Sequence, residues 1–279
     1  MLPVIEMFAS IQGEGNFAGQ PSFFMRVSGC NLRCVFKGSR CDTPYSSFDP
    51  ETSPYKTMDD LVNTFLEMVK KHRDVYHLVI TGGEPMMYKK ELIEFFKAIH
   101  PRLDGERDLF ITIETNGTIK PFTEAEEDEM GWGIDLYSVS PKLTNSVGEV
   151  GEYGLSKVAI ERHKKLRIQP EVLLAYVLTG KYQFKFVYSG ESVVDEIKNL
   201  YDVLETMVAQ ADDSGRYLTP AYMDFTSQHP QNHTLLMPEG LTNEQLANTR
   251  QECAEVCLRE GWTYTDRLHI VIWGDKRGV

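Results

Sequence analysis

The sequence lacks the features of a protein that binds nucleic acid broadly or enters a membrane. Its 279 residues carry a net charge of −12, with a pI near 5.1, which disfavours broad contact with nucleic acid or anionic lipid. The N-terminal stretch MLPVIEMFAS has neither the basic start nor the long apolar run of a signal peptide. No apolar run approaches the roughly 20 residues of a membrane span. We therefore expect a cytoplasmic protein with no nucleic-acid partner and no membrane partner.

Cysteine is also scarce. The five cysteines are odd in number and come without secretory features, which indicates reduced thiols rather than a disulfide framework. Cys253 and Cys257 lie four residues apart on an expected helix whose apolar stripe also holds Leu246 and Val256. Since a free buried cysteine behaves as a small apolar side chain, we expect these two to pack in the core.

Short apolar strands alternate with amphipathic helices along the chain. Thr57 and Asp60 fit a capping box at the start of one helix. The expected strands span residues 22–28, 77–81, 109–115, 136–140, 183–189, 221–227 and 267–273. The expected helices span residues 57–72, 89–100, 192–210 and a segment capped by Thr242 and Gln245, with a solvated helical turn at 123–130. This alternation predicts βα units, a mainly parallel sheet and a single α/β domain over residues 1–279.

Polar and glycine-rich segments follow several of these strands. In parallel-sheet folds, ligands bind at the carboxyl ends of the strands. The ends that carry reactive or polar side chains are 28–34, 81–85, 115–117, 138–142 and Lys185. We therefore expect the functional site to be built from these segments.

Three cysteines, Cys30, Cys34 and Cys41, share the loop 28–46 after the first expected strand. The loop contains glycine, asparagine and serine and has no helical stripe that would bury the thiols. A structural zinc ion would need a fourth ligand, and the loop offers no histidine. Three thiolates without a fourth protein ligand suit a [4Fe-4S] cluster with one open iron. The spacing alone leaves core packing and a zinc clip open as alternatives.

The cysteine loop, followed by TGGEP at 81–85 directly after a strand, resembles the radical S-adenosylmethionine (radical SAM) superfamily. The resemblance implies a [4Fe-4S] cluster, S-adenosylmethionine that is cleaved to a 5′-deoxyadenosyl radical, and an electron donor such as flavodoxin or ferredoxin. Physically, the two glycines allow close approach of the backbone to a ligand, and Glu84 can accept hydrogen bonds from an amino group.

Further segments resemble the 7-carboxy-7-deazaguanine synthase family within that superfamily. They are IQGEG at 11–15, the Arg26-x3-Cys30 spacing, CDT at 41–43, ETNGT at 114–118, SVSPKL at 138–143, QFKFV at 183–187, LMPEG at 236–240 and the closing HIVIWGDKRGV. The resemblance implies conversion of 6-carboxy-5,6,7,8-tetrahydropterin to 7-carboxy-7-deazaguanine with loss of ammonia, on the route to queuosine and related 7-deazapurines. It also implies Mg²⁺, a homodimer and a partial, shortened β/α barrel of the radical SAM type.

The resemblance assigns roles to individual residues. Cys30, Cys34 and Cys41 would hold the cluster, and Thr43 would contact Mg²⁺. The S-adenosylmethionine pocket would be formed by Arg40, Cys41, Asp42, Gly83, Glu84, Thr115, Asn116, Ser140, Pro141 and Lys142. The pterin would be held by Ile11, Gln12, Gly13, Glu14, Arg26, Thr81, His269 and Val279, with the expected strand 267–273 closing the pocket. In this arrangement Glu14 accepts from the guanidine-like edge of the pterin, and Arg26 clamps its carboxylate.

Plainer interpretations remain open for some of these residues. Arg26 is also compatible with a strand-end surface charge, Thr81 with a strand end, His269 with a core histidine and residues 12–15 with a simple turn. For the whole chain, the alternatives are a glycyl-radical-activating type of radical enzyme and a zinc-binding interaction module.

The cluster loop departs from the usual family pattern, C-x3-C-x2-C with an aromatic residue before the third cysteine. Here six residues separate Cys34 from Cys41, and Arg40 precedes Cys41. An insertion over about Phe36 to Ser39 can bulge outward at little entropic cost. The departure therefore leaves the cluster assignment in place and puts the adenine contact in question.

Overall fold

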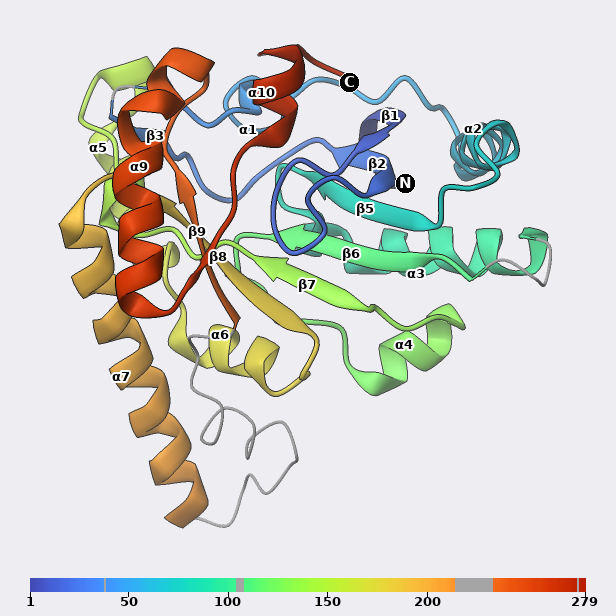
Figure 1. The fold of residues 1–279 in the computed structure, drawn as a ribbon. Helices are drawn as coiled ribbons and strands as arrows, with labels where there is room; N and C mark the ends of the chain where they lie inside the picture. The colour runs from blue at the N-terminus through green and yellow to red at the C-terminus, as the bar shows by residue number, and fades with distance from the viewer. Residues whose placement is uncertain (38, 104–107, 214–232, 275) are drawn as a thin grey trace.

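The protein is built around one eight-stranded sheet (Figure 1). The computed structural model describes residues 1–37, 39–103, 108–213, 233–274 and 276–279. In sheet order the strands are β1 (Val4–Ile11), β2 (Pro21–Val27), β5 (His77–Gly82), β6 (Phe110–Thr115), β7 (Leu136–Val139), β8 (Tyr182–Tyr188), β9 (Thr234–Pro238) and β10 (Thr263–Tyr264). β1 is antiparallel to β2, and every other neighbouring pair is parallel.

This order confirms the predicted mainly parallel α/β fold. Within the described ranges, β1 and β10 each have one strand neighbour, so the sheet is an open, partial barrel rather than a closed one. A separate two-stranded hairpin, β3 (Val35–Phe36) and β4 (Ser39–Arg40), lies in the cysteine loop. Because the parallel strands follow one another in sequence order, their carboxyl ends form one continuous rim.

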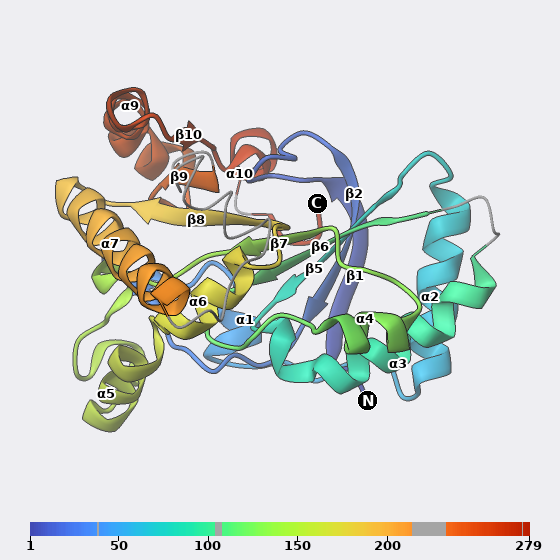
Figure 2. The same cartoon turned by 90° about the horizontal axis from the view of Figure 1, so that it is seen from below.

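Helices connect the strands and cover the sheet. They are α1 (Pro44–Ser47), α2 (Met58–Lys71), α3 (Lys89–Ile99), α4 (Glu124–Met130), α5 (Lys157–Leu166), α6 (Pro170–Val177), α7 (Glu191–Asp213), α9 (Asn243–Glu260) and α10 (Leu268–Trp273). α3 packs beside α2 and α4, and α9 packs against β9 and β10. Figure 2 shows α3, α4 and α6 along one side of the sheet and α10 on the other. None of the helices in the described ranges is long and apolar enough to span a membrane.

The core forms where apolar stripes of these helices meet the sheet. The predicted capping box is present at α2, where Thr57 accepts from the backbone N–H of Asp60 and Asp60 accepts from that of Thr57. Leu61 and Phe65 of α2 are fully buried. Cys253 and Cys257 are buried on α9 in the main core, as predicted. The capping box and the spacing of apolar residues in the sequence therefore predict both where α2 begins and which of its side chains are buried.

The sequence-based elements are confirmed to within a few residues, with one clear error. The predicted strand 267–273 is wrong, because residues 268–273 form α10. The run LHIVIW has strand-forming composition, but β10 already pairs with β9, and Leu268 N–H donates to the carbonyl of Gly13 instead of to a neighbouring strand. The predicted strand 221–227 lies outside the described residues. The strands and α-helices that were not predicted are β1, β3, β4, α1, α5, α6, β9 and β10.

His77 links three strands through its imidazole and gives the fold a predictable pH response. Ser22 Oγ donates to the carbonyl of Gln20, so His77 Nδ1–H donates to Ser22 Oγ at 2.8 Å, and His77 Nε2 accepts from Thr112 Oγ1 at 2.8 Å. Burial lowers the pKa of His77 from 6.5 to about 4. Between these two values the unfolded chain binds a proton that the folded chain does not, so stability falls as the pH falls.

We therefore predict that His77→Gln weakens the pH dependence of the free energy of unfolding. Between pH 7 and pH 4.5 the wild type should lose about 2 kcal/mol more than the variant, because one unit of pKa shift corresponds to about 1.4 kcal/mol. Denaturant unfolding of the cluster-free chain at several pH values measures this difference. Equal slopes for the two proteins would show that His77 is protonated equally in both states.

Candidate active site

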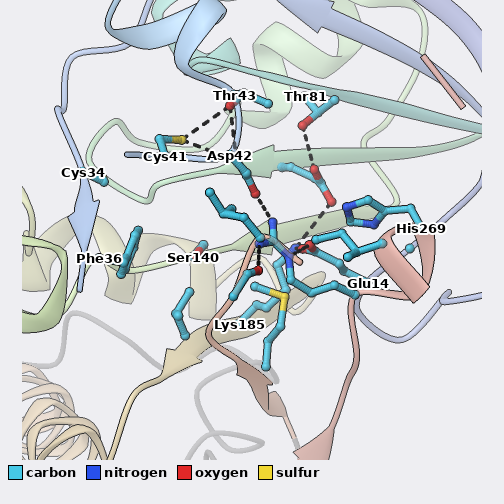
Figure 3. Close-up of a pocket in the computed structure, with 18 of the residues that line it drawn as sticks. Glu14, Cys34, Phe36, Cys41, Asp42, Thr43, Thr81, Ser140, Lys185 and His269 are labelled. Carbon is cyan, nitrogen blue, oxygen red and sulfur yellow. Dashed lines mark hydrogen bonds and ion pairs between the residues drawn. The ribbon is translucent and has the colours of Figure 1, made fainter. Parts of the chain in front are cut away.

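One large cavity lies at the carboxyl ends of the parallel strands. Its volume is about 700 Å³, and residues from β1, β2, β5, β6, β7, β8, the cysteine loop and α10 line it. Every site residue predicted from the sequence lines this cavity except Glu84 and Pro141. Figure 3 shows Cys34 and Cys41 on one side of the cavity and Glu14 on the other. The structure therefore brings the two predicted ligand sets together in one space.

A small hairpin closes the long gap between Cys34 and Cys41. β3 pairs with β4, and Val35 lies opposite Arg40. The backbone N–H of Cys41 donates to the carbonyl of Cys34 at 3.0 Å. The two cysteines are therefore neighbours at the base of the hairpin, although six residues separate them in the sequence.

The thiols of Cys30, Cys34 and Cys41 are free and face the same cavity. Leu32 N–H donates to Cys30 Sγ at 3.4 Å, and Cys41 Sγ lies 3.5 Å from Thr43 Oγ1. In the part of the chain that the structure describes, no three His, Cys, Asp or Glu side chains form a set arranged to hold a metal ion. The three thiols thus share a wall of the cavity without converging on one point.

The chemistry of this donor set fits an iron–sulfur cluster. Burial raises the pKa of the Cys30 thiol to about 12 and raises the pKa values of Cys34 and Cys41 as well. Lys142 favours the thiolate form of all three but does not offset burial. A bound metal deprotonates such thiols outright. Three cysteines without a histidine in their loop match a [4Fe-4S] cluster with one iron left open.

The TGGEP turn packs directly against the cysteine loop. The N–H of Gly83 donates to the carbonyl of Val27, and the N–H of Glu84 donates to the carbonyl of Gly29 at 2.8 Å. A Cβ atom at position 83 would collide with the carbonyl group of Gly29. Glycine at this position is therefore required for the close contact between the end of β5 and the loop that carries Cys30.

Glu84 holds the ends of β5 and β6 together. Its side chain is fully buried and accepts from Thr115 Oγ1 at 2.7 Å, from the N–H of Asn116 at 2.7 Å and from the N–H of Met86 at 3.0 Å. Glu84 does not line the cavity. The carboxylate of Glu84 thus receives its hydrogen bonds from protein groups. The predicted contacts of Glu84 and Pro141 with S-adenosylmethionine stay predictions.

A network of buried ion pairs forms the opposite side of the cavity. Lys185 Nζ lies 2.5 Å from Glu14 Oε2 and 3.6 Å from Glu114 Oε1. Arg267 Nε lies 3.0 Å from Glu14 Oε1, and its Nη2 donates to Asp42. Burial alone would raise the pKa of Glu14, but Lys185 and Arg267 lower it well below its usual value. Glu14 is therefore an ionised acceptor over the whole physiological pH range.

Other predicted pterin contacts are also oriented by protein partners. Gln12 Nε2 and Thr81 Oγ1 donate to the two oxygens of the Glu114 carboxylate, at 3.4 and 2.7 Å. Arg26 Nε donates to Glu6 Oε1 at 2.6 Å. These contacts position the side chains at the cavity before any ligand is bound.

Gly13 and His269, each predicted as a pterin contact, also touch each other although they lie in distant parts of the chain. A Cβ atom at position 13 would collide with Nδ1 of His269, so the glycine allows α10 to approach the end of β1. His269 lines the cavity, and burial lowers its pKa. The helix α10 takes the place of the predicted strand in closing this side of the cavity.

Two charges of this network, the half-buried Glu114 and the buried Arg267, were not predicted as site residues, and Lys185 was noted only as a strand end. Lys185 is 5% exposed and Arg267 is 5% exposed. The sequence does carry one signal: in QFKFV, Lys185 alternates with Phe184 and Phe186, which are fully buried on the other face of β8. A lysine at such a position points to an interior polar site.

The partial barrel, the cysteine loop and the strand-end turn define a protein of the radical SAM class, and the family model for the Radical SAM superfamily matches residues 25–180. A 7-carboxy-7-deazaguanine synthase from Halobacterium salinarum is 34% identical over 276 residues, which is 98% of this chain and 91% of that protein. One from Rhodopirellula baltica is 33% identical over 279 residues, covering 100% and 89%. The chain belongs to the 7-carboxy-7-deazaguanine synthase family.

A solved structure shows the same fold. The crystal structure of QueE from Escherichia coli matches with a TM-score of 0.53 and 22% identity, over 96% of this chain and 94% of that one. Family membership makes the chain a radical SAM enzyme of 7-deazapurine biosynthesis, with an iron–sulfur cluster and S-adenosylmethionine as cofactors. Neither a zinc-binding interaction module nor a glycyl-radical-activating enzyme finds support in these relatives.

We predict that the five cysteines fall into two functional groups. Alanine at Cys30, Cys34 or Cys41 should abolish the visible iron–sulfur absorption, because each thiolate is needed as a ligand. Alanine at Cys253 or Cys257 should leave the absorption intact and cost about 1 kcal/mol of stability, since each is a small buried apolar group. Anaerobic reconstitution followed by absorption spectroscopy measures this. A cluster retained by Cys41→Ala would contradict the assignment across the longer gap.

Proposed function

We propose that the enzyme converts 6-carboxy-5,6,7,8-tetrahydropterin to 7-carboxy-7-deazaguanine with loss of ammonia, in one radical SAM domain spanning residues 1–279. The observation that carries the proposal is that one cavity joins a wall of cysteine thiols to a set of buried, paired charges. Relatives named 7-carboxy-7-deazaguanine synthase, aligned over nearly the full chain, support the choice of product.

The cofactor half of the cavity would be held by the cysteine loop and the facing strand ends. Cys30, Cys34 and Cys41 would ligate the cluster, which when bound supplies the electron that cleaves S-adenosylmethionine to the 5′-deoxyadenosyl radical. Lys142 Nζ donates to Ser140 Oγ at 2.7 Å and faces the thiols, so it supplies positive charge beside an anionic cluster. The other residues proposed to contact S-adenosylmethionine are Arg40, Cys41, Asp42, Gly83, Glu84, Thr115, Asn116 and Pro141.

The substrate half would recognise the pterin by fixed polar contacts. Glu14 would accept from the amino and ring N–H groups of the guanidine-like edge, and Arg26 would bind the carboxylate. Ile11, Gln12, Gly13, Thr81, His269 and Val279 complete the proposed set and line the same cavity. Because Lys185 and Arg267 already hold Glu14, and Glu6 holds Arg26, little ordering remains to be done when the substrate binds.

The proposal extends to Mg²⁺, to the partners and to location. Thr43 lines the cavity directly after Asp42 and presents the hydroxyl proposed as a Mg²⁺ ligand. We propose a cytoplasmic homodimer that receives electrons from a flavodoxin or ferredoxin. Exposed apolar side chains on α10, those of Val271, Ile272 and Trp273, are compatible with a contact between two copies.

Thr43→Ala tests the Mg²⁺ site. We expect lower turnover and a weaker dependence of turnover on Mg²⁺ concentration, with an unchanged cluster spectrum, because only one oxygen ligand is removed. The measurement is a Mg²⁺ titration of product formation for both proteins. A variant with the wild-type rate at every Mg²⁺ concentration would show that Thr43 is only a loop hydroxyl.

Substitutions of Arg26 test the proposed pterin substrate. Loss of a partly buried bidentate clamp should cost about 2–4 kcal/mol, so Arg26→Ala should lower kcat/KM for the pterin by roughly 30- to 1000-fold. Arg26→Lys keeps the charge without the fork and should recover only part of this loss. The assay pairs two readouts, product formation from the pterin and release of 5′-deoxyadenosine without it.

The second readout separates substrate binding from cofactor binding. Cleavage of S-adenosylmethionine without substrate should survive both Arg26 substitutions, since Arg26 lies on β2, donates to Glu6 and meets the cysteine loop at the ring of Tyr45, beyond the last cysteine. Normal pterin turnover by Arg26→Ala would place the substrate carboxylate elsewhere. Equal loss of both activities would assign Arg26 to the fold or to the cofactor.

A further inference from the structure

The hairpin in the cysteine loop has two different faces. Val35 is 2% exposed and packs with Leu155 and Ile160, and the guanidinium of Arg40, its partner in β4, lies over the ring of Phe48 at 5.8 Å. Alternate side chains of a strand point to opposite faces. The next pair of the hairpin therefore has to face away from this apolar cluster.

That second pair is Phe36 and Ser39, and both residues line the cavity. Figure 3 shows the ring of Phe36 beside Ser140, on the same side of the cavity as Cys34 and Cys41. The longer gap between these cysteines thus sets the guanidinium of Arg40 against Phe48 and places an aromatic ring inside the cavity two residues after Cys34.

Glu239 lines the same cavity, and one oxygen of its carboxylate, Oε2, is buried and has unused acceptor capacity. Glu239 directly follows β9, and its backbone is fixed on both sides, since its N–H donates to the carbonyl of Tyr188 and its carbonyl accepts from Thr249 Oγ1. Among the residues that the structure describes, none donates a hydrogen bond to the buried Glu239 Oε2. The nearest cation is Lys37 Nζ at 3.7 Å, which joins the hairpin to this loop.

Several apolar residues line the cavity near this carboxylate. Val187, Met237, Pro238 and Leu241 line the cavity next to Glu239 in the chain or on the neighbouring strand. A buried acceptor without a donor is costly unless a ligand supplies one. An aromatic ring, apolar walls and a fixed acceptor together suit a planar heterocycle that carries an exocyclic amine.

We propose that Phe36 and Glu239 form the site for the adenine ring of S-adenosylmethionine, with Phe36 stacking on the ring and Glu239 accepting from its exocyclic amine. The proposal rests on the proposed placement of S-adenosylmethionine at the cysteine loop. It also accounts for the absence of an aromatic residue directly before Cys41, because Phe36 on β3 supplies the ring instead of the residue at position 40 on β4. It also makes Glu239 a specificity residue, because the carboxylate rejects a purine that presents a carbonyl there.

The stacking half is tested with S-adenosylhomocysteine, which binds but is not cleaved. Its Kd is measured by calorimetry on the cluster-loaded enzyme, under anaerobic conditions and without pterin. Phe36→Leu should raise the Kd about 10-fold, because a base stacked on an aromatic ring loses binding energy when the ring is removed. Phe36→Tyr keeps the ring and should stay within about 2-fold of the wild type. A wild-type Kd for the leucine variant, or an equal loss for the tyrosine variant, would overturn the stacking role.

The amine contact is tested by comparing S-adenosylhomocysteine with S-inosylhomocysteine, in which a carbonyl replaces the amine. The wild type should prefer the adenine compound by about 10-fold or more, and Glu239→Gln should reduce the preference to about 3-fold or less. Lys37→Ala is the matched control, because it removes the ion pair and leaves the acceptor in place, so the preference should remain. An unchanged preference in Glu239→Gln, or an equal loss in Lys37→Ala, would reduce Glu239 to an ion-pair partner of the hairpin and overturn the proposal.

These outcomes are independent of the reaction proposed above, since no pterin enters the binding measurements. Absent pterin turnover with a normal preference for the adenine compound would overturn the proposed substrate and leave the adenine site standing. The reverse result, full turnover with no effect of either substitution on binding, would overturn the adenine site alone.

Discussion

The buried guanidinium of Arg267 is the interaction on which the site depends. It contacts the carboxylates of Glu14 and Asp42 and donates to the carbonyl of Gly240 at 2.7 Å, so it joins the end of β1, the cysteine loop and the turn after β9. A buried charge is tolerated only when it is paired, and the loss of one partner leaves the others uncompensated. Asp42 lies between Cys41 and Thr43. The position of the cysteine loop is therefore tied to the same charge that orients the proposed substrate contact.

The same rule explains the contrast between Glu84 and Glu239. Both carboxylates lie at the ends of strands; Glu84 is fully buried, and the side chain of Glu239 is 11% exposed. Glu84 receives three hydrogen bonds from protein groups, which makes it a structural link between β5 and β6. The Oε2 atom of Glu239 receives none from the described residues, and Glu239 lines the cavity. The protein alone therefore satisfies Glu84, whereas Glu239 keeps an acceptor that a ligand can use.

The sequence was sufficient for features that are encoded locally. Strand periodicity predicted the parallel sheet, and nearly all of the site residues predicted from the sequence line the cavity, because parallel strands bring their carboxyl ends to one rim. Pairings between distant residues, such as Glu14 with Lys185 or Arg267, leave no local signal. The run 268–273 was assigned wrongly for a related reason: contacts with Gly13 and Asn243 decide its conformation, not its composition. The two faces of the hairpin likewise depend on packing that the cysteine spacing does not contain.

The contact between Glu14 and Arg267 also bears on how the enzyme is assembled. These residues are 253 positions apart, so their ion pair closes a very long loop of chain, and contacts of such separation form late in folding. The β1–β2 hairpin and the cysteine loop are synthesised long before Arg267 is available to fix Glu14 and Asp42. The final position of Asp42 in the cysteine loop is therefore set only after Arg267 has been made.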